Sequence, residues 1–335
     1  MNRKAIIVVA ALAAFIVVIS GTCFLQAGSS PAPAGCETIR VGMPALEQGA
    51  LIYIAEEQGI FDKNGLHVLV ADGYPDGTGP VRDMTEGTLD FSVSAEYPVI
   101  ASIFDGENIS IVATIDKYQN EMLIGRRDHG IAAVSDLRGR KIGLPRGTIL
   151  EFFLGMLLAR NGMHISDVTL VNVGAPDGAV AIESGEVDAV MTFQPHAGRI
   201  LDLLGDNAIS WPGQSDQLLY GVLAARSDWI RDHQDQTGRF LLSLEEARQY
   251  SLTHPDEVKE TVGRRMNVTG EYVDEVWPDH QFTLSLEQSL LLAMNDEGRW
   301  MTGNNMTPGS GVPDFRNNIW TDSLCAIAPR AVNIG

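Results

Sequence analysis

Two stretches of the sequence, "EGTLDFSVSAEYP" (86–98) and "SGEVDAVMTFQP" (184–195), share a pattern that indicates how the chain folds. In each stretch, a glycine follows the expected end of a helix, and an aliphatic residue and an aspartate then lead into an apolar strand. Gly87 and Asp90 of the first stretch correspond to Gly185 and Asp188 of the second. The match indicates that the chain contains the same structural unit twice.

Two further matches keep the same order along the chain. "RVGMP" (40–44) resembles "KIGLP" (141–145), and "KNGLHV" (63–68) resembles "RNGMHI" (160–165). Turn glycines and apolar strands recur in any pair of α/β units, so a single match would carry little weight. Three matches in register favour a true repeat.

Each repeated unit has the pattern of three strands alternating with two helices. Apolar residues spaced three or four apart predict helices at 50–58 and 148–160, and glycines stand where a helix needs a left-handed cap. Strands alternating with helices are typical of parallel sheets with right-handed crossovers. We therefore predict two similar α/β lobes. The other expected elements are strands at 39–43, 66–71, 89–94, 141–144, 168–173 and 187–192, and helices at 79–86 and 177–184.

Length and charge limit the classes of partner. The 335 residues leave room for two domains of ordinary size. The formal net charge of −19 argues against a nucleic-acid or anionic-membrane partner, because neither attracts a net acidic surface. An acidic, well-hydrated exterior is the simplest interpretation of this charge.

The N-terminus predicts a location outside the cytoplasmic membrane, in the periplasm or at the cell surface. Positive residues followed by a long uncharged apolar run make residues 1–26 an export signal or an uncleaved membrane anchor. Lipidation of Cys23 is an alternative, although Ser20 stands where a lipoprotein signal has an aliphatic residue. Residues 27–36, rich in Ser, Pro and Ala, are expected to form a flexible tether.

The loops after the strands are the expected ligand site, since open α/β sheets bind ligands at the carboxyl ends of their strands. Several of these loops lead into helix N-termini, which favour an anion or a strong acceptor. In "PRGT" (145–148) a cation, a flexible glycine and a hydroxyl suit an oxyanion; alternatively, Thr148 caps the helix and Arg146 is only exposed. In "GTGPVR" (77–82), Arg82 replaces the third glycine of a dinucleotide fingerprint, so this loop is interpreted as a helix start. The candidate ligand-binding residues are Glu47, Gln48, Thr78, Gly79, Ser94, Glu96, Tyr97, Tyr118, Arg146, Gly147, Thr148, Phe193 and Gln194.

These candidates also indicate the polarity of the ligand. Arg146 and the helix N-termini favour an oxyanion or a hydroxyl, whereas Glu96 on the same rim would repel a simple inorganic anion. We therefore expect a molecule with an amine or ring N–H at one end and an oxyanion or hydroxyl at the other. Tyr97, Tyr118 and Phe193 are candidate stacking surfaces. The alternative is that Glu96 pairs with Arg146 or another neighbour and does not meet the ligand.

Motifs for catalysis are absent from the sequence. It contains no phosphate-binding Walker loop, no His-Glu-x-x-His zinc helix, no Gly-x-Ser-x-Gly elbow and no clustered Cys/His ligands. His196, which follows a rim proline, is the histidine expected nearest to a cleft. We expect no enzymatic activity, no cofactor and no metal.

Four segments carry a resemblance to a known family. "YIAEEQGIFDKNGLHV" (53–68), "MTEGTLDFSVSAEYPVIAS" (84–102), "SDLRGRKIGLPRGT" (135–148) and "AIESGEVDAVMTFQP" (181–195) are similar to ABC-transporter substrate-binding proteins of the sulfonate, nitrate, taurine and thiamine-precursor group. The resemblance covers nearly the whole chain after residue 37. It implies a type II periplasmic-binding fold, in which two lobes joined by two crossover strands close on a small molecule.

This resemblance also implies a domain plan and a partner. Residues 37–118 and the helical 222–335 would form one lobe, and residues 119–221 the other. The implied partners are a small-molecule ligand and an ABC permease in the membrane, and we expect a monomer. A ligand sensor that feeds a signalling receptor remains an alternative, as does an enzyme on the same fold, although the cysteine-rich motif of pyrimidine synthases is absent.

The three cysteines, Cys23, Cys36 and Cys325, allow one disulfide in the exported body. An extracytoplasmic setting permits such a bond. Cys36 precedes the first strand, and Cys325 lies in the C-terminal segment that the resemblance returns to the same lobe. We therefore predict a Cys36–Cys325 disulfide, with two unpaired thiols as the alternative.

Overall fold

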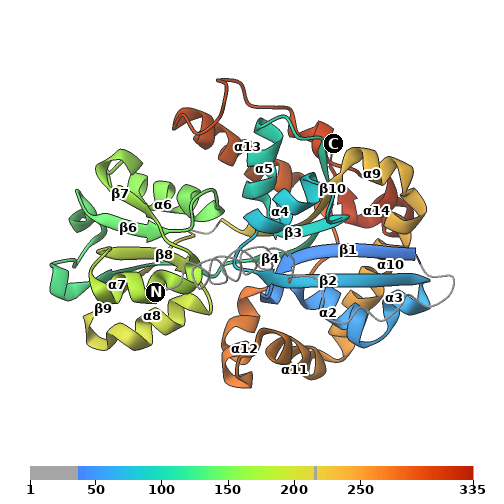
Figure 1. The fold of residues 1–335 in the computed structure, drawn as a ribbon, viewed down its shortest axis with the longest axis horizontal. Helices are drawn as coiled ribbons and strands as arrows, with labels where there is room; N and C mark the ends of the chain where they lie inside the picture. Colours follow the sequence, from blue (N-terminus) through green and yellow to red (C-terminus); the bar gives the residue numbers. More distant parts are fainter. Residues whose placement is uncertain (1–36, 215–216, 335) are drawn as a thin grey trace, which may run out of the picture. The chain divides into compact units, whose positions relative to one another are not determined.

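The computed structural model describes residues 37–214 and 217–334. These residues form two lobes, each built on a five-stranded mixed sheet (Figure 1). The predicted export segment, the tether, Cys23 and Cys36 lie outside the described residues. Within these two ranges, every helix is too short or too polar to cross a membrane.

Lobe 1 contains the sheet with strand order β2-β1-β3-β10-β4. Its first three strands in sequence are parallel, and β10 runs antiparallel to both of its neighbours. The strands are β1 (Glu37–Pro44), β2 (Leu66–Tyr74), β3 (Phe91–Ala95), β4 (Ile109–Tyr118) and β10 (Leu219–Arg226). The helices are α2 (Ala50–Glu57), α3 (Ile60–Lys63), α4 (Thr78–Thr85), α5 (Glu96–Phe104), α9 (Ser227–Asp232), α10 (Gln234–Thr253), α11 (Pro255–Met266), α12 (Gly270–Val276), α13 (Gln288–Gly303) and α14 (Asp322–Ile327).

Lobe 2 repeats this arrangement strand for strand, with the order β7-β6-β8-β5-β9. Its strands are β5 (Glu121–Arg126), β6 (Lys141–Leu144), β7 (Thr169–Asn172), β8 (Ala189–Phe193) and β9 (Ala208–Pro212), and its helices are α6 (Ile149–Arg160), α7 (Gly178–Ser184) and α8 (His196–Leu204). The predicted pair of similar α/β lobes is confirmed. The expectation of wholly parallel sheets is wrong, because β5 and β10 each enter their sheet from the other lobe and run against its direction.

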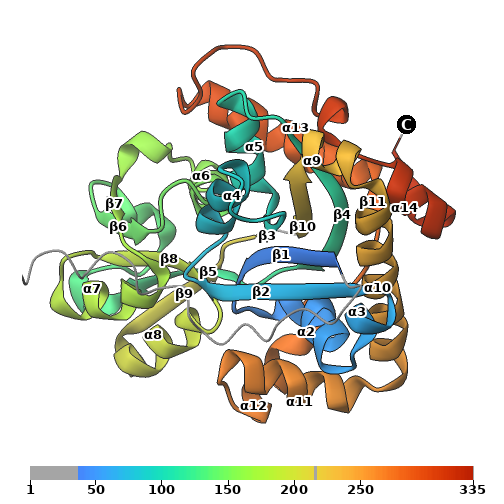
Figure 2. The same ribbon diagram turned by 45° about the vertical axis from the view of Figure 1, so that its right-hand side comes forward.

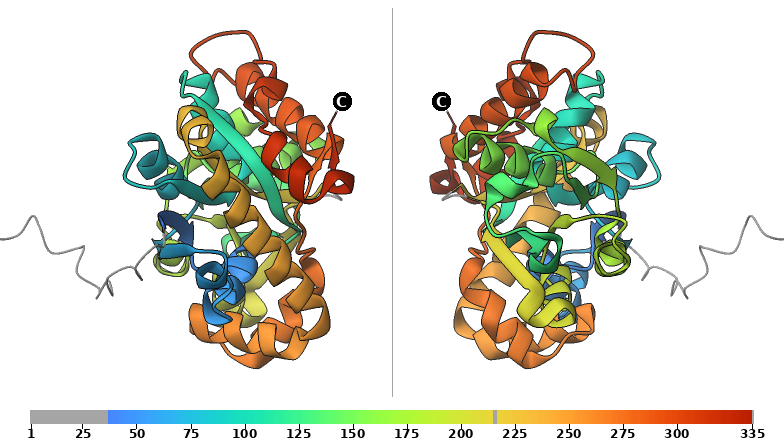
Figure 3. Two further views of the ribbon diagram at one scale, coloured as in Figure 1. Left: turned by 90° about the vertical axis from the view of Figure 1, so that its right-hand side faces the viewer. Right: turned by 90° about the vertical axis from the view of Figure 1, so that its left-hand side faces the viewer.

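The C-terminal helices pack on lobe 1 through an aromatic core. The ring of Phe240 on α10 stacks on Phe61 at 5.3 Å and on Phe91 of β3 at 4.9 Å, measured between ring centroids. Helix α2 packs against α10 and α11, while α4 and α5 contact strands β3 and β10. Figures 2 and 3 show the C-terminal helices, coloured gold to red, around this sheet.

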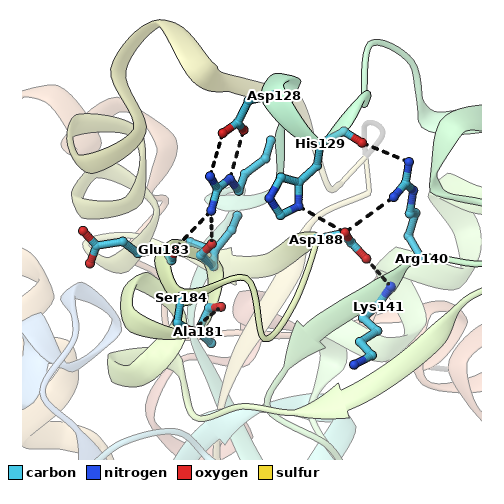
Figure 4. A network of polar contacts seen from close by, with 10 residues as sticks. Asp128, His129, Arg140, Lys141, Ala181, Glu183, Ser184 and Asp188 are labelled. Atoms are coloured by element: carbon cyan, nitrogen blue, oxygen red, sulfur yellow. Dashed lines mark hydrogen bonds and ion pairs between the residues drawn. The ribbon is translucent and has the colours of Figure 1, made fainter.

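The repeated Gly-x-x-Asp pattern has the same structural role in both lobes. The carboxylate of Asp90 accepts a hydrogen bond from the backbone N–H of Arg40 at 2.7 Å, and that of Asp188 accepts one from Lys141 at 3.0 Å. Figure 4 shows the lobe 2 version, where His129 and Arg140 also contact Asp188. The glycine three residues before each aspartate has a positive φ, 83° at Gly87 and 77° at Gly185. The repeated aspartate therefore ties the turn before β3 to β1 in lobe 1, and the turn before β8 to β6 in lobe 2.

The chain passes between the lobes twice, once between β4 and β5 at residues 119–120 and once between β9 and β10. Gln214 joins the two crossings. Its Oε1 accepts hydrogen bonds from the backbone N–H groups of Asn120 (2.9 Å) and Glu121 (3.2 Å), and its Nε2 donates to the carbonyl of Tyr118 at 3.0 Å. Of the predicted lobe boundaries, the one after residue 118 coincides with the end of β4, and the one after 221 falls inside β10.

Candidate functional site

A small cavity of about 40 Å³ lies where strand ends of the two lobes face each other. Lobe 1 contributes Gln48, Asp76 and Tyr118, and lobe 2 contributes Glu121 and Phe193. This volume holds one or a few water molecules, whereas pockets for small organic ligands usually measure about 300–1,000 Å³. The structure therefore has its lobes closely apposed, and a ligand would enter only after they separate.

The predicted site residues divide into three groups. Gln48, Tyr118, Thr148 and Phe193 line the cavity. Thr78 and Gly147 line an adjoining hollow of about 300 Å³, which shares Pro98 with the cavity. The remaining candidates lie outside the described lining of both: Glu47, Gly79, Ser94, Glu96, Tyr97, Arg146 and Gln194.

The loop predicted to bind an oxyanion already holds a carboxylate of this chain. Oε1 of Glu151 accepts hydrogen bonds from Nε of Arg146 and from the backbone N–H of Gly147, both at 2.7 Å. The Glu151 side chain is 2% exposed. The hydroxyl of Thr148 donates to the carbonyl of Pro145 at 2.8 Å, so it does not cap the helix by accepting an N–H. The pattern Thr-x-x-Glu in "TILE" (148–151) is a capping-box signal that could have identified Glu151.

The N-terminus of α4 is occupied in the same way. Oδ1 of Asp76 accepts from the backbone N–H of Thr78 at 2.9 Å and from the Thr78 hydroxyl at 2.5 Å. Gly79 has a packing role, because a Cβ at this position would lie 2.5 Å from a ring carbon of Tyr74. The loop before α6 and the first residue of α4, where an anion was expected, therefore each bond to a carboxylate of the chain itself.

Glu96 is fully buried, away from the cavity lining and without a contact to Arg146. Its Oε2 accepts the backbone N–H of Tyr220 at 3.0 Å. Burial raises the pKa of Glu96 to about 7, although hydrogen bonds partly oppose the shift. Its neighbour Glu297 on α13 is also fully buried, and burial together with the Glu96 charge raises the pKa of Glu297 well above 4.5.

Two polar residues of the cavity wall, Asn120 and Glu121, were missed in the sequence. Oδ1 of Asn120 is buried and has no hydrogen-bond partner among the described residues. Glu121 is 5% exposed, and burial raises the pKa of its carboxyl to about 8. Both belong to the polar segment "DKYQNE" (116–121) between two apolar strands. A polar segment at a lobe crossing is the signal that could have found them.

The aromatic ring of Tyr118 is already partly covered by protein. It stacks on His280, with ring centroids 5.0 Å apart, and its hydroxyl donates to Oε1 of Gln48 at 3.1 Å. Nδ1 of His280 lies 2.6 Å from Oδ2 of Asp116. Tyr118 therefore offers the cavity one remaining ring face and a hydroxyl that is held in place.

Other hollows and clusters add no competing site. A wide surface hollow of about 750 Å³ lies between α11 and α12, where charged residues are paired, as in Lys259–Asp274 at 2.7 Å. Within the ranges that the structure describes, no three His, Cys, Asp or Glu side chains gather so as to hold a metal ion. His196 contacts the edge of Phe193 at 5.4 Å and is outside the described cavity lining.

Sequence comparison places the chain in a family. The profile of the family described as "NMT1/THI5 like" matches residues 47–258, which is more than half of the chain. The chain belongs to this family. The NMT1/THI5 like chain is 24% identical over 274 residues to a binding protein of Brucella abortus, covering 79% of this chain and 83% of that one. It is 26% identical over 273 residues to a protein of Bacillus subtilis named as aliphatic sulfonates-binding, covering 78% and 81%.

Solved structures confirm the fold of this NMT1/THI5 like chain. The alkanesulfonate-binding protein SsuA of Xanthomonas axonopodis pv. citri, bound to MOPS, superposes with a TM-score of 0.73 at 16% identity, over 88% of this chain and 99% of that one. The desulfurization enzyme DszB superposes with a TM-score of 0.63 at 17% identity, over the same shares. The predicted periplasmic-binding fold and the resemblance to ABC substrate-binding proteins are both confirmed.

Proposed function

We propose that this chain is the extracytoplasmic solute-binding component of an ABC importer. It captures a small polar organic molecule between its lobes and releases it to a permease in the membrane. Its relatives include proteins named for binding aliphatic sulfonates and one named for thiamine biosynthesis. Sulfonates, taurine-like molecules and pyrimidine-like thiamine precursors are therefore the ligand classes to test first.

The observation that carries this proposal is the position of the cavity. Residues of both lobes line it, and it lies beside the two short chain crossings that Gln214 joins. A ligand in this place contacts both lobes only when they are closed. Those contacts supply the free-energy difference between open and closed forms that drives hinge closure.

A direct contact between the lobes supports a reversible closure. Trp300 of α13 in lobe 1 packs against α6 of lobe 2, where its ring meets Phe152 edge-on at 5.7 Å. It also lies over Gly155, at which an added Cβ would be 2.5 Å from the indole. This apolar contact stabilises the closed arrangement and is broken when the lobes separate.

The location and the partner follow from the same proposal. An N-terminal export segment would keep the folded body outside the cytoplasmic membrane, tethered by an anchor or a lipid, where a permease can receive the solute. The closed monomer presents surfaces of both lobes together, which allows a permease to distinguish loaded from empty protein.

Small-angle scattering with enzyme assays tests the proposed function. Addition of the right ligand should reduce the radius of gyration, and the ligand should be recovered chemically unchanged. The fold of DszB is the reason to include the second measurement, since an enzyme can be built on this fold. Turnover of a bound compound by the purified protein would contradict the proposal.

A further inference from the structure

We propose that the cleft recognises a protonated amine or amidine of its ligand, held by the carboxylate of Glu121 and the side-chain carbonyl of Asn120. The inference rests on the proposed function and gives the substrate class of the same cleft. It differs from the sulfonate-binding names of the relatives, because the group that it assigns to the ligand is a cation.

The first observation is a pair of acceptors that face the cavity. Asn120 is 9% exposed and lines the cavity, and its Oδ1 is buried without a hydrogen-bond partner among the described residues. Glu121 is adjacent in the same wall, and one of its oxygens accepts a long bond of 3.3 Å from the Asn120 backbone N–H. A buried acceptor without a donor is costly, so a ligand that brings N–H groups gains from this position.

The second observation is the lack of a compensating cation. Among the described residues that line the cavity there is no Lys, Arg or His, whereas Asp76 and Glu121 are both present. The nearest predicted cation, Arg146, is engaged by Glu151. A sulfonate or nitrate in this cavity would face two carboxyl groups without a positive partner, while an ammonium or amidinium would find its partners in place.

Protonation gives this inference a distinctive readout. Burial, together with a smaller contribution from Glu96 of α5, raises the pKa of Glu121 to about 8, and His280 opposes this rise. Asp76 and the hydroxyl of Tyr118 are the other titratable groups in the cavity wall. A bound cation stabilises the ionised carboxylate, so cation binding at pH 7 should release a proton. The affinity should rise with pH until it levels off above about 8.

Pairs of ligands with the same carbon skeleton distinguish recognition of a cation from recognition of an anion. Isothermal titration of the full chain at pH 7 should detect binding of ethylammonium and benzylammonium but not of ethanesulfonate and phenylmethanesulfonate, which have the same carbon skeletons. Taurine, which carries both groups, should bind through its ammonium. Titrations in two buffers of different ionisation enthalpy should show proton release with each amine.

Variants of residues in the cavity wall show which side chains bind the amine and release the proton. Glu121→Gln should weaken amine binding by about tenfold or more and abolish the proton release, because it removes the charge that pairs with the ligand. Asn120→Ala removes the unpaired acceptor and should weaken binding several-fold with the proton release kept. Glu186→Gln, at an exposed position of the same lobe, is the matched control and should change neither quantity.

Several results would overturn the inference. They are binding of the sulfonates in preference to the amines, absence of amine binding at millimolar concentration, and full affinity in the Glu121→Gln protein. If a sulfonate bound and compacted the protein, the solute-binding function would stand and the cation assignment would fail. Chemical conversion of an amine would instead contradict the proposed function.

Discussion

Replacing Glu297 with Gln is expected to stabilise the protein at pH 7 but hardly at pH 5. The Glu297 side chain is fully buried, and its pKa is raised well above 4.5 by burial and by the neighbouring Glu96 carboxyl. Neither of its oxygens accepts a hydrogen bond of normal geometry from another described residue. The folded protein therefore holds a proton on this carboxyl to a higher pH than the unfolded chain does.

The size of the effect follows from proton linkage. In the unfolded chain Glu297 ionises near its ordinary pKa of 4.5, so folding above that pH takes up protons at this carboxyl. The folded pKa is raised, and stability is therefore lost as pH rises above the unfolded value. Each pH unit between the unfolded and the folded pKa costs about 1.4 kcal/mol, so the stability lost between pH 5 and pH 7 is at most about 3 kcal/mol. The neutral Gln side chain avoids this cost and still offers an N–H to the unpaired Oε1 of Glu96.

Urea unfolding at the two pH values measures this prediction. The free energy of unfolding of Glu297→Gln minus that of the unaltered chain should grow from pH 5 to pH 7, by at most about 3 kcal/mol. Glu186→Gln, which changes an exposed carboxylate, should show no such growth. A difference that stays constant with pH, or a variant that is less stable at pH 7, would refute the reasoning that Glu297 is held protonated.

Three further outcomes are expected from other contacts. Burial alone would lower the pKa of His280, but the neighbouring Asp116 carboxylate raises this pKa above 6.5. The His280–Asp116 pair therefore stabilises the fold fully below pH 6.5, and its contribution is lost as the pH rises through the folded pKa. Asp116→Asn should therefore lower the free energy of unfolding by about 1–3 kcal/mol at pH 6 and by less at pH 9, as measured by urea unfolding. Gly155→Ala places a Cβ 2.5 Å from the ring of Trp300, so it should weaken the contact between the lobes and increase the radius of gyration of the ligand-free protein; an unchanged radius would count against this contact. Non-reducing mass spectrometry should find the Cys36–Cys325 disulfide, which would stabilise the fold by about 2–4 kcal/mol, and complete maleimide labelling of the exposed Cys325 without reductant would exclude it.

The repeat could be recognised in the sequence because the local backbone conformation requires particular residues at its turns. Glycine enters the turns at Gly87 and Gly185 with the least strain, and the aspartates three residues later accept the backbone N–H groups of Arg40 and Lys141. The directions of β5 and β10 were not readable. They depend on which lobe a strand comes from, and hydrophobic patterns are the same for both directions.

The sequence predicted the place of the cavity better than it predicted the polar contacts of the residues around it. Gln48, Tyr118, Thr148 and Phe193 line the cavity because strand ends of α/β sheets meet at one edge, and their role in ligand binding stays a prediction. The partner of Arg146, Glu151, was not anticipated, because the capping-box pattern Thr-x-x-Glu at 148–151 was not used. Asn120 and Glu121 were missed because the polar segment 116–121 was not used as a signal, and their burial is created only when the two lobes pack together.

A distance measured between the two lobes is the most direct test of ligand capture by lobe closure. Val180 on α7 and Leu252 on α10 are both 66% exposed and belong to different lobes, so spin labels at Val180→Cys and Leu252→Cys would report closure. The three native cysteines would be replaced by Ser. Pulsed electron paramagnetic resonance should show a broad or longer distance distribution without ligand, and a narrower, shorter one with the ligand that calorimetry identifies. The same distribution with and without a saturating, bound ligand would contradict capture by lobe closure.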